Sequence, residues 1–271
     1  MKEKDVIGTT RSPITINQII EDAGHLGISR SDMLLVHSSL SSIGWVCGGP
    51  QAVVQALLTA VGEGGTLVMP AQSSDWSDPA EWENPPVPET WRKVIYEEWP
   101  AFDPAITPTR GMGRIAELFR TFPGTYRSNH PQVSFCANGA FAASIVADHP
   151  LTPQFGPDSP LGKLYAWPSK AKVLLLGVGY DSCTSFHLAE TLLEGMPRKS
   201  MGAPIAVKGE RVWQQFEDYD YDSGNFAEIG RRFDEQGEVR TGYIGRAYCR
   251  LFGMREAVDY AGRWLMENRK V

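Results

Sequence analysis

Several features that mark other protein classes are absent from this sequence. No apolar run approaches the ~18 to 20 residues that cross a bilayer, and no apolar core of a signal peptide follows the charged residues 1–5. The four cysteines include no CxxC pair, which fits free thiols better than a zinc site or a disulfide framework. A net charge of -6 argues against a nucleic-acid partner. We therefore expect a cytoplasmic protein that binds neither membrane nor nucleic acid.

Metal-ligand spacings are missing as well. The five histidines form no HxH or HExxH pair. We therefore expect no metal site. His25 and His149 are expected to be structural residues, whereas His37, at the end of a strand, and His130, before a proline, are expected either to order loops or to touch a ligand. His187 stands apart because of its position in the chain.

The stretch 172–190 predicts a buried strand, a tight turn and a short helix. Residues 173–176 are continuously apolar, as in a strand covered on both faces, and Gly177 and Gly179 follow. The helix carries His187 and, three residues later on the same face, Glu190. Open α/β sheets place their sites beyond the carboxyl ends of such strands. We therefore predict the active site at this turn.

Two further short strands and a helix give the start of the chain the pattern of a parallel-sheet unit. The strands are expected at 32–37 and 66–69, and a helix begins near Gly48-Gly49-Pro50 between them. A serine-rich turn, residues 38–42, follows the first strand. The remaining pattern predicts helices over 15–26, 112–121, 140–147, 225–235 and 254–267, one beginning at Pro160, strands over 133–136 and 239–244, and a hairpin of 202–207 with 211–216. The chain is expected to be a single α/β domain over 1–271.

Residues 71–108 interrupt this alternation of strands and helices and contain seven prolines and four tryptophans. Loops longer than ~12 to 15 residues in a compact domain are usually functional or disordered, and a tryptophan-rich loop is rarely disordered. Two interpretations stay open. The excursion is either a structural insertion with its own small core or a wall of acids and aromatics suited to a polycation.

Three local patterns allow other chemistry. The run Gly177-Val-Gly179 is similar to a nucleotide-binding loop but lacks its third glycine. Cys183 precedes His187 by four residues, a spacing compatible with a thiolate nucleophile. The serine turn 38–42 is compatible with an anion-binding nest.

Six motifs together resemble the aminoglycoside 3-N-acetyltransferase family, and the resemblance extends from about residue 14 to 267. Their order and spacing, more than any one motif, carry the resemblance. The motifs lie at residues 37–44, 64–70, 107–113, 127–131, 174–181 and 184–190. The resemblance implies a three-layer α/β/α fold with a central mixed sheet. It also implies acetyl transfer from acetyl-CoA to the 3-amino group of 2-deoxystreptamine aminoglycosides, a reaction of antibiotic resistance.

The same resemblance implies roles for particular residues. His187 is the expected catalytic base, oriented by Glu190 or Asp222, with Asp220 as an alternative. The acceptor drug is expected to meet Asp75, Asp220 and Asp222. The expected contacts to coenzyme A are Ser38, Ser39, Arg110, Met112, Arg127 and Lys163.

Alternatives to this function remain. The fold and the acetyl-CoA donor could serve a different amine acceptor, or the glycine turn could belong to a nucleotide- or CoA-binding protein without chemistry. A third alternative is a thiol enzyme that uses Cys183. Either a monomer or a homodimer is compatible with the sequence.

Overall fold

A mixed sheet forms the centre of the computed structural model, which describes residues 3–269. Its strands are β1 (Met33–Ser38), β2 (Thr66–Pro70), β3 (Tyr126–Arg127), β4 (Phe135–Gly139), β5 (Lys172–Leu176), β8 (Arg240–Ile244) and β9 (Ala247–Gly253). Within the described residues their order is β3-β4-β2-β1-β5-β9-β8. β1 pairs in parallel with both β2 and β5, whereas all the other pairings are antiparallel. The predicted α/β fold with a mixed sheet is confirmed.

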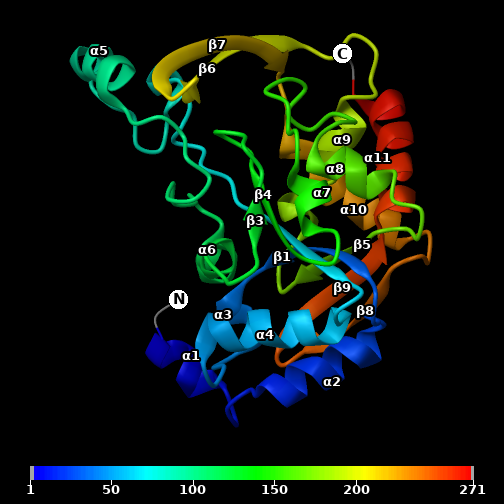
Figure 1. Ribbon diagram of the computed structural model, residues 1–271. Coiled ribbons are helices and arrows are strands. Elements are labelled where there is room, and N and C mark those ends of the chain that lie inside the picture. The colour runs from blue at the N-terminus through cyan, green and yellow to red at the C-terminus, as the bar shows by residue number, and fades with distance from the viewer. Residues whose placement is uncertain (1–2, 270–271) are drawn as a thin grey trace.

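Helices cover both faces of this sheet, as Figure 1 shows. On one side lie α2 (Ile16–Leu26), α4 (Gly49–Val61) and α6 (Gly113–Arg120). On the other lie α7 (Ala142–Val146), α8 (Pro160–Tyr165), α9 (Phe186–Glu190), α10 (Phe226–Asp234) and α11 (Met254–Asn268). Two short helices, α1 (Glu3–Thr9) and α3 (Leu40–Ile43), complete the first side of the molecule. No helix within residues 3–269 has the length and apolar character needed to cross a membrane.

Alternation along the central strand divides the core between the two faces. Leu34 and Val36 pack with α2 and α4, whereas Met33 and Leu35 pack with the helices of the opposite face. All four side chains are at most 3% exposed. Both faces of the strand are therefore dry, which explains its uninterrupted apolar sequence.

Helix α2 shows how local signals set the ends of an element. Its N-cap, Thr15, accepts a hydrogen bond from the backbone of Gln18, and its C-cap, Gly27, has φ of 109°. Ile19, Ala23 and Leu26 are buried at helical spacing. Cap, apolar stripe and terminal glycine agree with the predicted helix.

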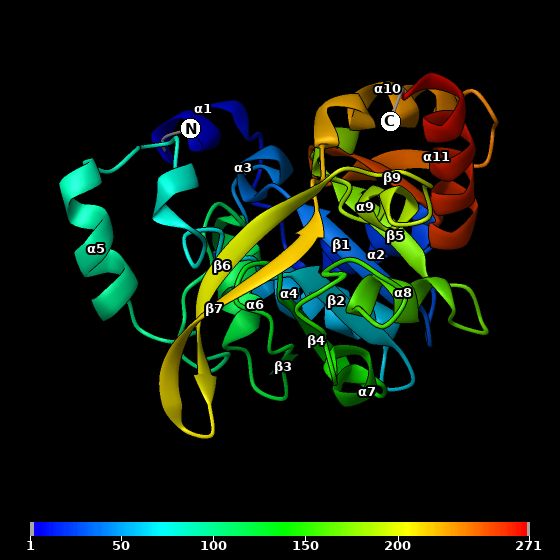
Figure 2. The same cartoon turned by 90° about the horizontal axis from the view of Figure 1, so that it is seen from above.

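The excursion 71–108 contains the short helix η1 (Pro79–Glu81) and helix α5 (Glu89–Glu98). The rings of Trp76 and Trp82 pack edge-on against Trp99, with centroids 5.6 and 5.2 Å away. These rings form a small aromatic core inside the excursion. Helix α5 was not predicted, and none of its residues is buried; it projects from the body of the molecule in Figures 1 and 2.

The predicted hairpin is longer than expected and forms a separate two-stranded sheet, β6 (Arg198–Val207) with β7 (Glu210–Tyr219). Figure 2 shows it crossing above the main sheet towards the excursion. Arg211 donates to the Trp99 carbonyl at 2.7 Å, and the Tyr96 and Trp213 rings meet edge-on at 4.7 Å. The hairpin and the excursion therefore support each other.

Strand β9 and helix α1 were also missed by the sequence pattern. β9 lies between β5 and β8, directly beside the strand that precedes the predicted site. Its polar and aromatic residues Tyr248 and Arg250 alternate with the buried Cys249 and Leu251. This alternation lacks the continuous apolar run that identified the other central strands.

Two buried histidines, His130 and His149, pack ring against ring with centroids 4.7 Å apart. Nε2 of His149 lies 2.7 Å from the Gln154 carbonyl oxygen, and Nδ1 lies 2.9 Å from the Ser128 hydroxyl. Burial lowers the pKa of His149 to about 4 and that of His130 well below its usual range. Both rings are therefore neutral in the folded protein at neutral pH.

Acid is expected to destabilise the fold through His149. The unfolded histidine takes up a proton below about pH 6.5, whereas the folded one resists protonation down to about pH 4, so stability falls as the pH drops through that window. Urea unfolding should show a loss of about 2 kcal/mol from this group between pH 7 and pH 5. The variant His149→Gln should show a correspondingly smaller pH dependence. His25→Gln, at an exposed position, is the control; equal pH dependence in all three proteins would contradict the expectation.

Candidate active site

The loops after β1, β2 and β5 surround a cleft of about 730 Å³ at the carboxyl edge of the parallel strands. The serine turn after β1 contributes Ser38, Ser39 and Ser41 to the lining. Gln72 comes from the loop after β2, and His187 comes from α9. Open α/β sheets bind their ligands at this position.

The serine turn and the glycine turn touch at Gly177, which has φ of 68°. A Cβ at this position would lie 2.5 Å from the Cβ of Ser42. The Ser42 hydroxyl donates to the Gly177 carbonyl at 3.0 Å. Gly177 is therefore required for the close approach of two loops that line the cleft.

His187 lies in the first turn of α9 with its ring at the cleft. Its Nδ1 is 2.5 Å from Oε2 of Glu190, whose side chain is 0% exposed. An ionised carboxylate only accepts hydrogen bonds, so Nδ1 carries the hydrogen and Nε2 is the nitrogen available to take a proton. This geometry is that of an oriented general base.

Aromatic rings fix the orientation of the imidazole. Phe155 stacks on the His187 ring with centroids 4.7 Å apart and an interplanar angle of 10°. Phe226 lies 4.7 Å away in a tilted arrangement, and Tyr221 meets the ring edge-on at 5.5 Å. Packing on these sides restricts rotation of the ring and keeps Nδ1 on the carboxylate.

The carboxylate that contacts the imidazole is that of Glu190. Asp222 reaches Glu190 through its backbone N–H, which donates to Oε1 at 3.0 Å. The carboxylate of Asp222 accepts from the Gly224 amide at 2.8 Å and caps the short helix η3 (Ser223–Asn225). Oε1 of Glu190 also accepts from Arg269, a residue that the sequence analysis did not consider.

Asp220 lies near an acid of the excursion. Its carboxylate is 3.0 Å from Nζ of Lys199, and the same Nζ is 3.9 Å from Glu81. The Asp220 side chain is about half exposed. One lysine of the hairpin thus joins two carboxylates that are far apart in the sequence.

Asp75 is paired with a residue predicted to bind coenzyme A. Its Oδ2 lies 3.5 Å from Nη1 of Arg110, and the Arg110 backbone amide donates to the Gln72 carbonyl. Oδ1 of Asp75 is buried and accepts no hydrogen bond from the described residues. An unpartnered buried carboxylate oxygen is costly unless a ligand supplies the donor.

The predicted cofactor residues fall into two groups. Ser38, Ser39 and Met112 line the cleft, and Arg110 immediately precedes Gly111, which lines it as well. Arg127 and Lys163 are not among the lining residues. The ammonium of Lys163 donates to the Ala147 carbonyl.

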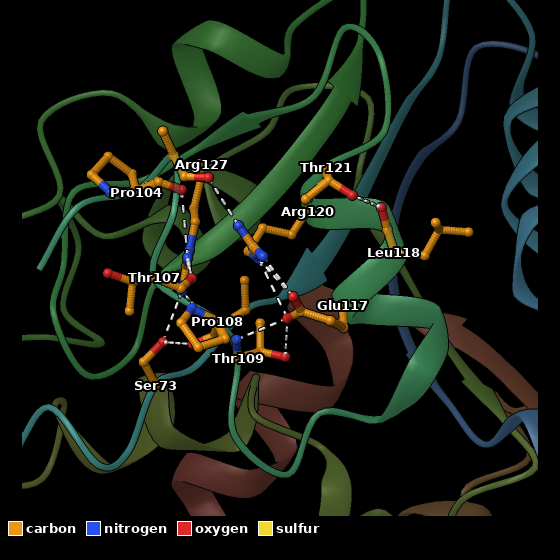
Figure 3. Close-up of polar contacts among 12 residues, drawn as sticks. Ser73, Pro104, Thr107, Pro108, Thr109, Glu117, Leu118, Arg120, Thr121 and Arg127 are labelled. Carbon is orange, nitrogen blue, oxygen red and sulfur yellow. Dashed lines mark hydrogen bonds and ion pairs between the residues drawn. The ribbon is translucent and has the colours of Figure 1, made fainter.

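Arg127 holds loops together, as Figure 3 shows. Its guanidinium donates to the carbonyls of Thr107 and Ala71 and to the hydroxyls of Ser73 and Ser134. Burial lowers its pKa to about 10, which still leaves it charged at neutral pH. These contacts join the loop after β2, the end of the excursion and the residue before β4, so they give no support to a role in binding coenzyme A.

Other residues of the cleft were missed from the sequence. Arg114 and Trp45 line it, as do Glu3 and Val6 of α1. The Trp45 indole donates to Glu3 at 3.1 Å, which holds α1 against the cleft. Arg114 directly follows the motif 107–113, and this adjacency was the available signal; α1 had none.

His37 also lines the cleft, and burial lowers its pKa to about 3. Its Nε2 lies 3.4 Å from the Thr184 hydroxyl. His37 is therefore a neutral wall residue. Over residues 3–269, no three or more His, Cys, Asp or Glu side chains gather closely enough to hold a metal ion.

Cys183 is fully buried, and its sulfur lies 3.1 Å from the Ser185 hydroxyl. Burial raises the pKa of the thiol to about 12. A reactive cysteine requires a lowered pKa and access to solvent. The geometry is that of a packing residue.

The chain matches the model of the aminoglycoside 3-N-acetyltransferase family over residues 35–266. It belongs to this family of enzymes, and the resemblance inferred from its motifs is confirmed. An aminoglycoside N(3')-acetyltransferase-like protein, YokD of Bacillus subtilis, is 48% identical over 98% of this chain and 97% of its own length. Aminoglycoside N(3)-acetyltransferase VII of Streptomyces paromomycinus is 35% identical over 99% and 97%.

Solved structures agree with this assignment. The crystal structure of B. subtilis YokD superimposes with a TM-score of 0.96 at 46% identity, covering 99% of this chain and 100% of YokD. A binary structure of AAC-IIIb with CoASH gives 0.83 at 33% identity, covering 94% and 97%. AAC-VIa bound to sisomicin gives 0.85 at 31% identity, covering 96% and 100%.

Cys183→Ala is expected to keep its turnover of aminoglycosides because the buried thiol, with its raised pKa, supplies no thiolate. Iodoacetamide should label the exposed Cys47 and leave Cys183 unmodified, which mass spectrometry of the native protein would detect. Cys47→Ser is the control for indirect effects of labelling. Loss of most activity in Cys183→Ala, with folding intact, would restore the thiol-enzyme alternative.

Proposed function

We propose that this protein transfers the acetyl group of acetyl-CoA to the 3-amino group of 2-deoxystreptamine aminoglycosides, with His187 as general base. The observation that carries the proposal is the pair of His187 and the buried Glu190 at the cleft. Family membership supports the acceptor class, and the CoASH complex of AAC-IIIb supports the donor.

The chemistry requires a base because an aminoglycoside amine is protonated near neutral pH and cannot attack as an ammonium. Nε2 of His187 accepts a proton as the nitrogen attacks the thioester carbonyl carbon. The new C–N bond gives a tetrahedral intermediate, and its collapse breaks the C–S bond. The thiolate of coenzyme A takes up the second proton that the nitrogen loses, and His187 passes the first to solvent. The products are therefore the N-acetylated drug, free coenzyme A and one released proton.

The oxyanion of the intermediate requires hydrogen-bond donors. The amides of Ser39 and Gly177 are already used, since they donate to Leu176 and Tyr248 carbonyls. The amides of Leu40 and Ser41 lie in the first turn of α3, where backbone N–H groups have no acceptor within the helix. We assign the oxyanion contact to these amides of the serine turn.

The donor is expected to occupy the side of the cleft formed by the serine turn and residues 111–114. Ser38, Ser39 and Met112 lie there, and Arg114 adds a cation suited to phosphate. Arg110 lies next to this segment, but its guanidinium also pairs with the carboxylate of Asp75. Arg127 and Lys163 are not part of this proposal, because their donors are engaged by backbone and side-chain oxygens elsewhere.

The acceptor is expected to meet the acids at the edge of the site. Oδ1 of Asp75 is a buried acceptor without a donor among the described residues, which suits one ammonium group of the drug. Asp220 and Asp222 are exposed carboxylates on the chain that leaves the hairpin. Sisomicin bound to AAC-VIa supports an aminoglycoside as the ligand of such a site.

The test is the release of coenzyme A thiol from acetyl-CoA, followed with a chromogenic thiol reagent, with gentamicin-, kanamycin- and neomycin-type drugs. Drug-dependent release and a product acetylated at the 3-amino group by NMR are the expected results. Release without a drug measures hydrolysis and is the blank. Absence of release with every drug, while acetyl-CoA still binds, would overturn the proposed acceptor and favour another amine.

Replacement of the base is expected to separate chemistry from binding. His187→Ala should lower kcat by about 10²- to 10⁴-fold, the usual contribution of a positioned general base. Calorimetry should show near-normal binding of acetyl-CoA because Nε2 acts on the amine. His25→Ala, at an exposed position that is not among the lining residues, should behave like the natural protein. Full turnover in His187→Ala would refute the assignment.

A further inference from the structure

The guanidinium of Arg269 lies immediately beyond the end of α11 and contacts two separate segments, α9 and residues 222–225. Nη1 donates to Oε1 of Glu190, and Nη2 donates to the Asp222 carbonyl at 2.8 Å. Nε and Nη2 both donate to the Asn225 side chain, at 3.1 and 2.9 Å. The Arg269 side chain is 13% exposed. Figure 1 shows the end of α11 beside α9, in agreement with these contacts.

Arg269 supplies a charge that Glu190 requires. The Glu190 side chain is 0% exposed, and a buried carboxylate without a countercharge loses its ionised form or destabilises the fold. A neutral imidazole on Oε2 and a backbone amide on Oε1 offer hydrogen bonds but no positive charge. Among the described residues, Arg269 is the cation that bonds this carboxylate.

We propose that Arg269 is a positioning residue for catalysis: it keeps Glu190 ionised and aimed at Nδ1 of His187, and it fixes the segment 222–225 beside the cleft. This inference rests on the proposed role of His187 as base. Arg269 positions Glu190, and Glu190 positions His187. Only His187 meets the acceptor amine. A cation at the carboxyl end of a helix is also favoured by the helix dipole.

The other ionisable groups near the pair do not replace this cation. Asp218 and Asp222 are acids, and Tyr221 is a phenol whose pKa is raised by burial. His37, behind Thr184, is neutral because burial lowers its pKa. The titratable residues that contact the pair from neighbouring elements are Tyr221, Asp222 and Arg269. Asp181 lines the same cleft, and Asp218 interacts electrostatically with Tyr221.

The first test compares Arg269→Gln and Arg269→Lys with Arg255→Gln. Arg255 is a matched control because it lies near the start of the same helix and donates to the Tyr165 and Trp167 carbonyls, apart from the cleft. Arg269→Gln should lower kcat about tenfold or more, as expected for groups that orient a catalytic side chain. Arg269→Lys should retain more activity, and guanidinium ion added to Arg269→Gln should restore part of kcat. Arg255→Gln should lower the stability of the fold and leave kcat unchanged.

The pH profile gives a readout that a purely structural role would not change. Removal of the positive charge beside the buried Glu190 carboxylate disfavours the anionic form of that carboxylate. The acid limb of kcat/KM should therefore move to higher pH in Arg269→Gln, less in Arg269→Lys and not at all in Arg255→Gln. An unmoved limb, together with no rescue by guanidinium, would overturn the proposal and leave Arg269 a structural anchor.

A second readout does not depend on acetyl transfer. Ring ¹⁵N shifts of His187, assigned by their loss in His187→Gln, should report hydrogen on Nδ1 in the natural protein and a mixture of tautomers in Arg269→Gln. If no drug is acetylated but this change occurs, the proposed acceptor fails and the positioning role stands. Identical shifts in both proteins would contradict the positioning role, whatever the activity.

Discussion

The site depends on one buried negative charge, the carboxylate of Glu190. Both of its oxygens are engaged, by the His187 imidazole on one and by Arg269 and the Asp222 amide on the other. Because the interior does not tolerate an uncompensated charge, these contacts draw α9, the segment after the hairpin and the end of α11 to a single point. The orientation of the base is therefore a property of the assembled fold and not of α9 alone.

The sheet places this point beside the cleft. Parallel strands β1, β2 and β5 end at one edge, so the first residues of the three loops that follow them converge there. Gly177 then allows the serine turn and the glycine turn to pack against each other. The dry faces of β1 make this platform rigid, since its side chains are locked between two helical layers. Loops positioned on such a scaffold can carry chemistry although they lack regular structure.

Sequence patterns located the parts of this arrangement that depend on local signals. The apolar runs of β1, β2 and β5 and the spacing of His187 and Glu190 were readable because burial and helix geometry are periodic. The partner of Glu190 could not be identified from the sequence. Arg269 is a single arginine near the end of an amphipathic helix, and nothing local distinguishes it from a solvated charge. For Arg127, the family resemblance suggested a contact to coenzyme A, whereas in the structure the carbonyl oxygens of Thr107 and Ala71 take up its donors. Strand β9 was hidden by its alternation.

Two of the acids proposed to bind the acceptor already have a cation as partner. Asp75 faces Arg110, and Asp220 faces Lys199. A polycation that binds Oδ2 of Asp75 and the carboxylate of Asp220 therefore competes with side-chain cations, so at these oxygens its binding is an exchange of one positive group for another. Such an exchange leaves the local charge nearly unchanged, and the affinity then depends less on ionic strength than the number of ammonium groups on the ligand would suggest.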